Sequence, residues 1–113
     1  MQVTINRIAA DVCVAPQLDA AAMQALADQG FKSVINNRPD FEGGPDQPTS
    51  AQMEAAAHAA GLQYRYLPVN GAYQSPEEIA QFGALLDSLP RPILAFCRSG
   101  ARSTKLYAAA TQR

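Results

Sequence analysis

The part of this chain best suited to chemistry is a short segment with one cysteine. The cysteine follows an apolar run and precedes two arginines. Residues 92–105 read P-I-L-A-F-C-R-S-G-A-R-S-T-K. A cysteine thiolate is a strong nucleophile, whereas an isolated cysteine is more often a small, inert core residue. The glycine and the two arginines close to Cys97 favour a nucleophile over a buried structural cysteine.

The loop that follows Cys97 has the composition of an anion-binding turn. A turn between a strand and a helix can direct successive N–H groups at an anion, and the helix dipole adds positive potential. Such surroundings lower a cysteine pKa from about 8.5 to roughly 3.5–7.5. Arg102 can donate two parallel hydrogen bonds to an oxyanion, and Ser103 can donate one to the sulfur. We therefore predict that Cys97, Arg102 and Ser103 are catalytic. The anion-binding loop is predicted to comprise Arg98, Ser99, Gly100 and Ala101.

Alternating strands and helices must position this loop. Apolar or alternating runs predict strands at residues 3–8, 12–15, 31–37, 62–69 and 93–97. Helical spacing and caps predict helices from Asp19 to Gly30, from Thr49 or Ser50 to Gly61, from Ser75 to about Pro90, and from about Ala101 onward. This alternation builds a mostly parallel sheet with helices on both faces. We predict a single α/β domain over residues 1–113.

Three predicted loops follow the carboxyl ends of parallel strands and therefore meet at one edge of that sheet. Ligands of parallel sheets bind at this edge. They span residues 37–48, 70–74 and 97–102, and the first holds three prolines and two glycines in the stretch 38–48. A loop this long inside a small domain is often functional. The candidate pocket residues on these loops are Arg38, Asp40, Asn70 and Tyr73. The alternatives are an ion pair of Arg38 with Asp40 or Glu42, and simple exposure of Tyr73.

Composition excludes several classes of function. With 48% hydrophobic and 17% charged residues the 113-residue chain is typical of globular proteins, and a net charge of −1 attracts neither nucleic acid nor an anionic membrane. No apolar run approaches the ~20 residues that span a bilayer, and the first residues lack the pattern of a signal peptide. We expect a reduced, cytoplasmic protein without nucleic-acid or membrane partners.

The remaining cysteine and histidine do not suggest a metal. Cys13 is expected in the core of an early strand, in preference to a role as a resolving partner for Cys97. His58 stands alone, and the acidic residues at 40–46 lack the spacing of a calcium loop. We therefore expect no metal and no cofactor.

Several segments of the chain resemble known families. C-x2-G-x-R-S after an apolar strand resembles the active-site loop of rhodanese-type sulfurtransferases and that of cysteine-dependent phosphatases. V-I-N-N-R-P-D-F-E, A-A-A-H-A-A-G-L-Q-Y, Y-L-P-V and I-L-A-F-C-R-S-G-A-R-S together resemble a bacterial family, the phosphatase-like domain of β-lactamase hydrolase-like proteins. That resemblance covers nearly the whole chain. It implies a fold like that of dual-specificity phosphatases, and it implies a persulfide dioxygenase as a partner.

Two departures from the tyrosine-phosphatase pattern favour sulfur chemistry. That family spaces its cysteine and arginine as C-x5-R, whereas Arg102 gives C-x4-R here, a shorter loop that resembles the rhodanese loop. Its general acid lies on the loop where this chain has Asn70, and an amide cannot replace a carboxylic acid. The sequence cannot place Asp40, Glu42 or Asp46 in that role.

We therefore predict a sulfurtransferase that carries sulfane sulfur as a Cys97 persulfide, from thiosulfate or a persulfide to an acceptor thiol. The alternative is a cysteine-dependent phosphatase acting on a phosphoester through a phosphocysteine. A third hypothesis is a non-catalytic module that binds an anion or a partner.

Overall fold

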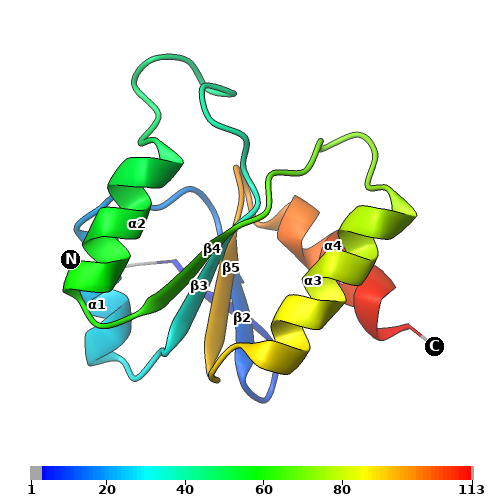
Figure 1. Ribbon diagram of the computed structural model, residues 1–113, viewed down its shortest axis with the longest axis horizontal. Helices are drawn as coiled ribbons and strands as arrows, with labels where there is room; N and C mark the ends of the chain where they lie inside the picture. The colour runs from blue at the N-terminus through cyan, green and yellow to red at the C-terminus, as the bar shows by residue number, and fades with distance from the viewer. Residues whose placement is uncertain (1–3, 113) are drawn as a thin grey trace.

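The computed structural model describes residues 4–112, which form a five-stranded sheet flanked by four helices (Figure 1). The strands are β1 (Asn6–Ala9), β2 (Val12–Ala15), β3 (Ser33–Asn36), β4 (Gln63–Tyr66) and β5 (Ile93–Phe96), in the spatial order β1-β2-β5-β3-β4. Only the β1–β2 pair is antiparallel. The predicted mostly parallel α/β fold is confirmed. Val3, the predicted first residue of the first strand, lies outside the described residues.

Strand β5 is the centre of the sheet, and its sequence explains why. It pairs with β2 on one side and with β3 on the other, and all four of its residues are buried. A parallel strand covered on both faces needs apolar side chains in succession, which I-L-A-F provides. Because Phe96 ends the strand, the next residue, Cys97, emerges at the middle of the carboxyl edge.

Two helices cover each face of the sheet (Figure 1). Helices α1 (Ala22–Asp28) and α2 (Ser50–Ala59) contact each other, as do α3 (Pro76–Ser88) and α4 (Ala101–Thr111). Side chains alternate between faces along a strand, so Leu94 and Phe96 join the core beneath α1 and α2. Ile93 and Ala95 join the core beneath α3 and α4.

Local capping fixes where the longer helices begin. The Thr49 hydroxyl accepts a hydrogen bond from the Gln52 N–H, and the Gln52 side chain accepts one from the Thr49 N–H. Ser75 and Glu78 form the same reciprocal pair at α3, as S-P-E-E predicts. Asp19 was expected to begin α1, but it accepts the Ala22 N–H in a turn, and the helix begins at Ala22.

The helices in residues 4–112 lack the length and apolar content needed to cross a membrane.

Candidate active site

Cys97 lies at the turn between β5 and α4 with its side chain covered. The residue is 1% exposed, and its N–H donates to the Ala15 carbonyl at 3.3 Å. The Gly100 N–H donates to Cys97 Sγ at 3.0 Å. Gly100 has a φ of +93° and is the N-cap of α4, a conformation that favours glycine. This turn therefore directs amide hydrogens at the sulfur.

The surroundings of Cys97 favour the thiolate. Burial raises the pKa of a thiol, but here hydrogen bonds from the Ser103 N–H and hydroxyl, and from the Gly100 and Ser99 N–H groups, outweigh it. The pKa of Cys97 is therefore lowered from its ordinary value. Donors that stabilise the charged form have this effect, and the α4 N-terminus adds to the positive potential.

Ser103 connects Cys97 to a buried amide. Its hydroxyl lies 2.8 Å from Asn37 Oδ1, and it is also within reach of the Cys97 sulfur. One hydroxyl proton can be donated to only one of these acceptors at a time. Asn37 is held in turn, because its Nδ2 donates to the Leu67 carbonyl and its N–H to the Phe96 carbonyl. The Ser103 hydroxyl can therefore donate to the Cys97 sulfur when that sulfur is a thiolate.

Arg102 has two free hydrogen-bond donors on one edge of its guanidinium. Nη1 contacts the Val69 carbonyl at 3.0 Å and Glu42 Oε2 at 3.1 Å, and Nη2 donates to Glu42 Oε1 at 3.1 Å. Two hydrogen bonds and one ion pair thus engage the two terminal nitrogens on the side that faces Val69 and Glu42. The donors left over are Nε–H and the second Nη2 hydrogen, which lie parallel on the same edge. Nε is buried without a partner.

Gly71 lies against this edge of Arg102. A Cβ at position 71 would lie 3.0 Å from Arg102 Nη2, 3.3 Å from Nε and 3.4 Å from Cζ. The two nitrogens are closer than Cζ, so the added carbon would sit over the free edge. Any residue larger than glycine here would displace the guanidinium or cover its donors.

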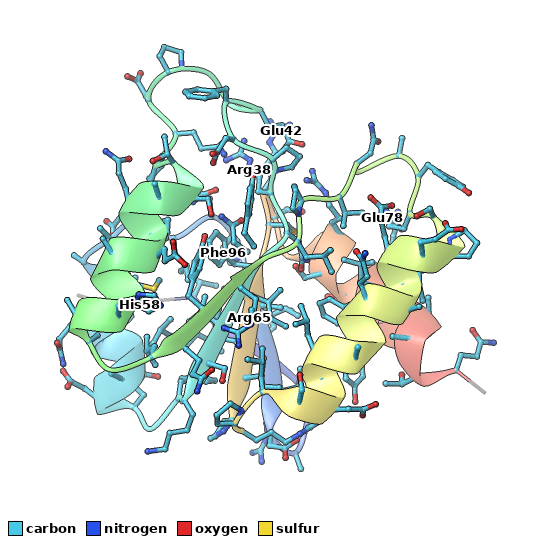
Figure 2. The ribbon with its side chains drawn as sticks, viewed as in Figure 1. Arg38, Glu42, His58, Arg65, Glu78 and Phe96 are labelled. Carbon is cyan, nitrogen blue, oxygen red and sulfur yellow. The ribbon has the colours of Figure 1, made fainter. Side chains whose placement is uncertain are left out.

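Glu42 holds Arg102 and Arg38 together. Arg38 Nε donates to Glu42 Oε1 at 2.9 Å, and Arg38 Nη1 donates to Gln17 Oε1 at 3.2 Å. Figure 2 shows Arg38 and Glu42 on the long loop after β3, above the carboxyl edge of the sheet. Partial burial raises the pKa of Glu42, but the hydrogen bonds and charges of Arg102 and Arg38 lower it overall. This carboxylate is ionised at neutral pH, and it fixes the orientation of both arginines.

The other predicted pocket residues have different partners. The Asp40 carboxylate accepts the Ser50 N–H at 2.7 Å, at the start of α2. Asn70 Oδ1 accepts the Ala72 N–H at 2.7 Å within its own loop. Tyr73 is 66% exposed, and Arg98 and Ser99 are exposed on the outer side of the turn. The structure thus connects Arg38 to Arg102 through Glu42, whereas Asp40 and Asn70 are engaged locally.

Sequence reasoning missed two residues of this arrangement, Asn37 and Gly71. Asn37 is a fully buried amide directly after a buried strand, a signal that could have singled it out. Glu42 was considered both as an acid and as an ion-pair partner of Arg38; the ion pair is present at 2.9 Å, whereas the contact of Glu42 with Arg102 was not predicted. Gly71 could not have been found, because only the tertiary contact with Arg102 gives it a role.

Cys13 is far from Cys97 along the sheet. Its strand β2 aligns Cys13 with Leu94, three residues before Cys97 on the neighbouring strand. At about 3.3 Å per residue this separates the two positions by roughly 10 Å, beyond the reach of a disulfide. Burial raises the pKa of Cys13, partly offset by the charge of Arg7. Cys13 packs against the core beneath α1 and α2.

Within the described part of the chain, no group of three or more His, Cys, Asp or Glu residues could hold a metal ion.

The fold and the cysteine loop together define the class: an α/β domain built like the cysteine phosphatases. The sequence model of the phosphatase-like domain of β-lactamase hydrolase-like proteins matches residues 4–112. The chain therefore belongs to this family, as its resemblance implied.

Two relatives illustrate the match. A β-lactamase hydrolase-like protein of Agrobacterium fabrum is 39% identical over 101 residues, which is 89% of this chain but 23% of that relative. The chain thus spans less than a quarter of that protein's length. A solved structure from Neisseria meningitidis, described as a candidate phosphatase, superposes with a TM-score of 0.85 at 30% identity, covering 92% of this chain and 73% of that one.

More distant structures share the fold alone. The Pseudomonas aeruginosa protein TpbA, solved in complex with phosphotyrosine, gives a TM-score of 0.66 at 16% identity. That match covers 94% of this chain and 60% of the TpbA chain. The family match and the Neisseria structure place the chain among phosphatase-like domains and support the hydrolase alternative better than the sulfurtransferase that the loop length favoured.

Proposed function

We propose that this chain is a cysteine-dependent phosphatase in which Cys97 attacks the phosphorus of a phosphomonoester. The observation that carries the proposal is the pair of free donors on one edge of Arg102, one of them buried without a partner. Two parallel N–H donors match two oxygens of a tetrahedral oxyanion. A persulfide sulfur on Cys97 carries no oxygens to accept from these donors.

The residues of the loop take complementary roles in the first step. The Cys97 thiolate forms an S–P bond while the P–O bond to the leaving group breaks, and the leaving oxygen departs with that electron pair. Arg102 holds two non-bridging oxygens, and the turn amides offset the negative charge. The position of Cys97 just before α4 and of Arg102 in the first turn of that helix supports these roles.

In the second step water attacks the phosphocysteine. A P–O bond forms, the P–S bond breaks, and the sulfur recovers its electron pair as a thiolate. The proton of the water passes to solvent or phosphate. The Ser103 hydroxyl is placed to donate to the departing sulfur, because it lies between Cys97 and Asn37 Oδ1.

Sulfur transfer is the second candidate, and one observation favours it. The carboxylates of Asp40 and Glu42 are engaged elsewhere, and sulfite or a thiolate can leave without the proton that an alkoxide needs. Thiosulfate could use the same Arg102 edge through its sulfonate oxygens. A persulfide dioxygenase as a partner belongs to this second function, and the short C-x4-R loop supports it as well.

One experiment separates the two functions. Purified protein and its Cys97→Ser variant are incubated with 4-nitrophenyl phosphate and, separately, with thiosulfate. Release of 4-nitrophenol that is lost in the variant supports the phosphatase. A covalent adduct with the mass of one sulfur atom on Cys97, without phosphate hydrolysis, would reverse the order. If neither occurs, the chain is better described as an anion-binding module.

Either chemistry needs a reduced Cys97. A reducing compartment such as the cytoplasm, which was expected from the cysteine content, is therefore part of the proposal.

A further inference from the structure

We propose that this site acts only on substrates whose leaving group departs as a stable anion, such as aryl phosphates, and fails on alkyl phosphates. This inference rests on the proposed phosphatase function and names its substrate class. It follows from what each carboxyl group near Cys97 is doing. Protonation of the leaving oxygen by a side chain is typically worth ~10²–10⁴-fold in rate.

The loops that leave β2, β3, β4 and β5 at the carboxyl edge of the sheet carry four carboxyl groups, those of Asp19, Asp40, Glu42 and Asp46. The Asp19 carboxylate accepts the Ala22 N–H at 3.0 Å in a turn. Asp40 accepts the Ser50 N–H at 2.7 Å and thereby holds the start of α2. Asp46 lines a shallow groove against α2 with Gln52 and Ala55. Neither carboxyl contacts a residue of the Cys97 turn in the part of the chain that the structure describes.

Glu42 is the carboxyl closest to the reaction, and it is held as an anion. Glu42 Oε1 accepts from Arg102 Nη2 at 3.1 Å and from Arg38 Nε at 2.9 Å, and Oε2 forms an ion pair with Arg102 Nη1 at 3.1 Å. A carboxylate shared between two guanidinium groups strongly favours its charged form. To donate a proton it would have to release both arginines, and Arg102 would then lose the contact that orients its free edge.

The loop facing Arg102 offers no replacement. Asn70 Oδ1 accepts the Ala72 N–H at 2.7 Å, and its amide has no acidic proton to give. Tyr73 is the one phenol on this loop, and it is 66% exposed. The leaving oxygen therefore departs unprotonated and takes its proton from water afterwards, so its intrinsic stability as an anion limits the rate.

The test is a series of aryl phosphates whose phenols differ in acidity, from 4-nitrophenyl phosphate to phenyl phosphate, followed by an alkyl phosphate. We expect kcat/KM to fall by at least ~100-fold across the aryl series, and turnover of the alkyl ester to be lost. The Tyr73→Phe variant should give the same dependence on phenol acidity. A rate that hardly changes with the leaving group would overturn the inference.

Two outcomes distinguish a failure of this inference from a failure of the proposed phosphatase function. If 4-nitrophenyl phosphate itself is not hydrolysed, the proposed phosphatase is wrong. If it is hydrolysed and the dependence on phenol acidity is shallow, the phosphatase stands and an unassigned acid is present. A shallow dependence that becomes steep in Tyr73→Phe would identify that acid as Tyr73, contrary to the proposal.

Discussion

Replacing Gly71 by alanine tests whether Arg102 presents its free edge to an anion. The new Cβ would lie 3.0 Å from Nη2 and 3.3 Å from Nε of Arg102. Both separations are shorter than the ~3.5–4.0 Å of a comfortable non-bonded contact. The guanidinium is held by the Val69 carbonyl and Glu42, so it can yield only by weakening those bonds or by turning its edge away.

The expected effect on catalysis is large for one methyl group. Loss of one donor to a developing charge reduces the rate by ~10²–10³-fold, and a 1 Å misplacement by about 10²-fold. A shift of a few tenths of an ångström with partial cover of the edge should therefore lower kcat/KM by roughly 10- to 100-fold. This corresponds to about 1.4–2.7 kcal/mol of transition-state stabilisation.

Activity and folding must be measured together. The assays are kcat/KM with 4-nitrophenyl phosphate, the inhibition constant of orthovanadate as a phosphate-like oxyanion, and the midpoint of thermal unfolding. Gly71 is exposed and does not have a positive φ, so alanine should leave the unfolding midpoint nearly unchanged. Orthovanadate should inhibit the variant less well than the parent chain.

Gly83→Ala is the matched control. Its Cβ would meet Ala110 Cβ at 3.6 Å, an ordinary contact between α3 and α4 remote from Cys97. Alanine in a helix interior stabilises by up to about 1 kcal/mol, and activity should be unchanged. If Gly71→Ala kept full activity and full orthovanadate affinity, the free edge of Arg102 would not be the anion site.

Three further predictions concern the same loop. Iodoacetamide should alkylate Cys97 at pH values below the ordinary thiol pKa, because the pKa of Cys97 is lowered, and it should alkylate Cys13 more slowly, because the pKa of Cys13 is raised. Peptide mass spectrometry across a range of pH measures both alkylation rates. Equal rates for the two cysteines would contradict a Cys97 thiolate. Since catalysis needs that thiolate, activity should be lost as pH falls through the pKa of Cys97. Arg102→Lys keeps the charge but loses the fork, and should lower kcat/KM by ~10²–10³-fold, while Arg98→Lys, at an exposed position, should have no effect. Asn37→Leu leaves buried partners unpaired and should lower the free energy of unfolding in urea by about 1–3 kcal/mol; an unchanged urea midpoint would show that Asn37 carries no structural role.

The sequence alone determined the fold class and the position of Cys97 at the carboxyl edge of the sheet. A fully apolar I-L-A-F run can be satisfied only at the centre of a covered parallel sheet, so the residue after it had to emerge at the carboxyl edge. Glycine at position 100 and the following helix made an amide turn there the natural outcome. These are local signals, because the spacing of the apolar residues and the residues that cap the helices are both set by neighbours in the sequence.

The tertiary structure decided which side chains meet Cys97. Glu42 and Arg102 are 60 positions apart, and nothing in either segment says that one carboxylate will clasp two arginines. The role of Gly71 exists only through that contact, because a missing side chain carries no signal of its own. The free edge of Arg102, which turned the interpretation from sulfur transfer to phosphate, depends on how three separate loops converge.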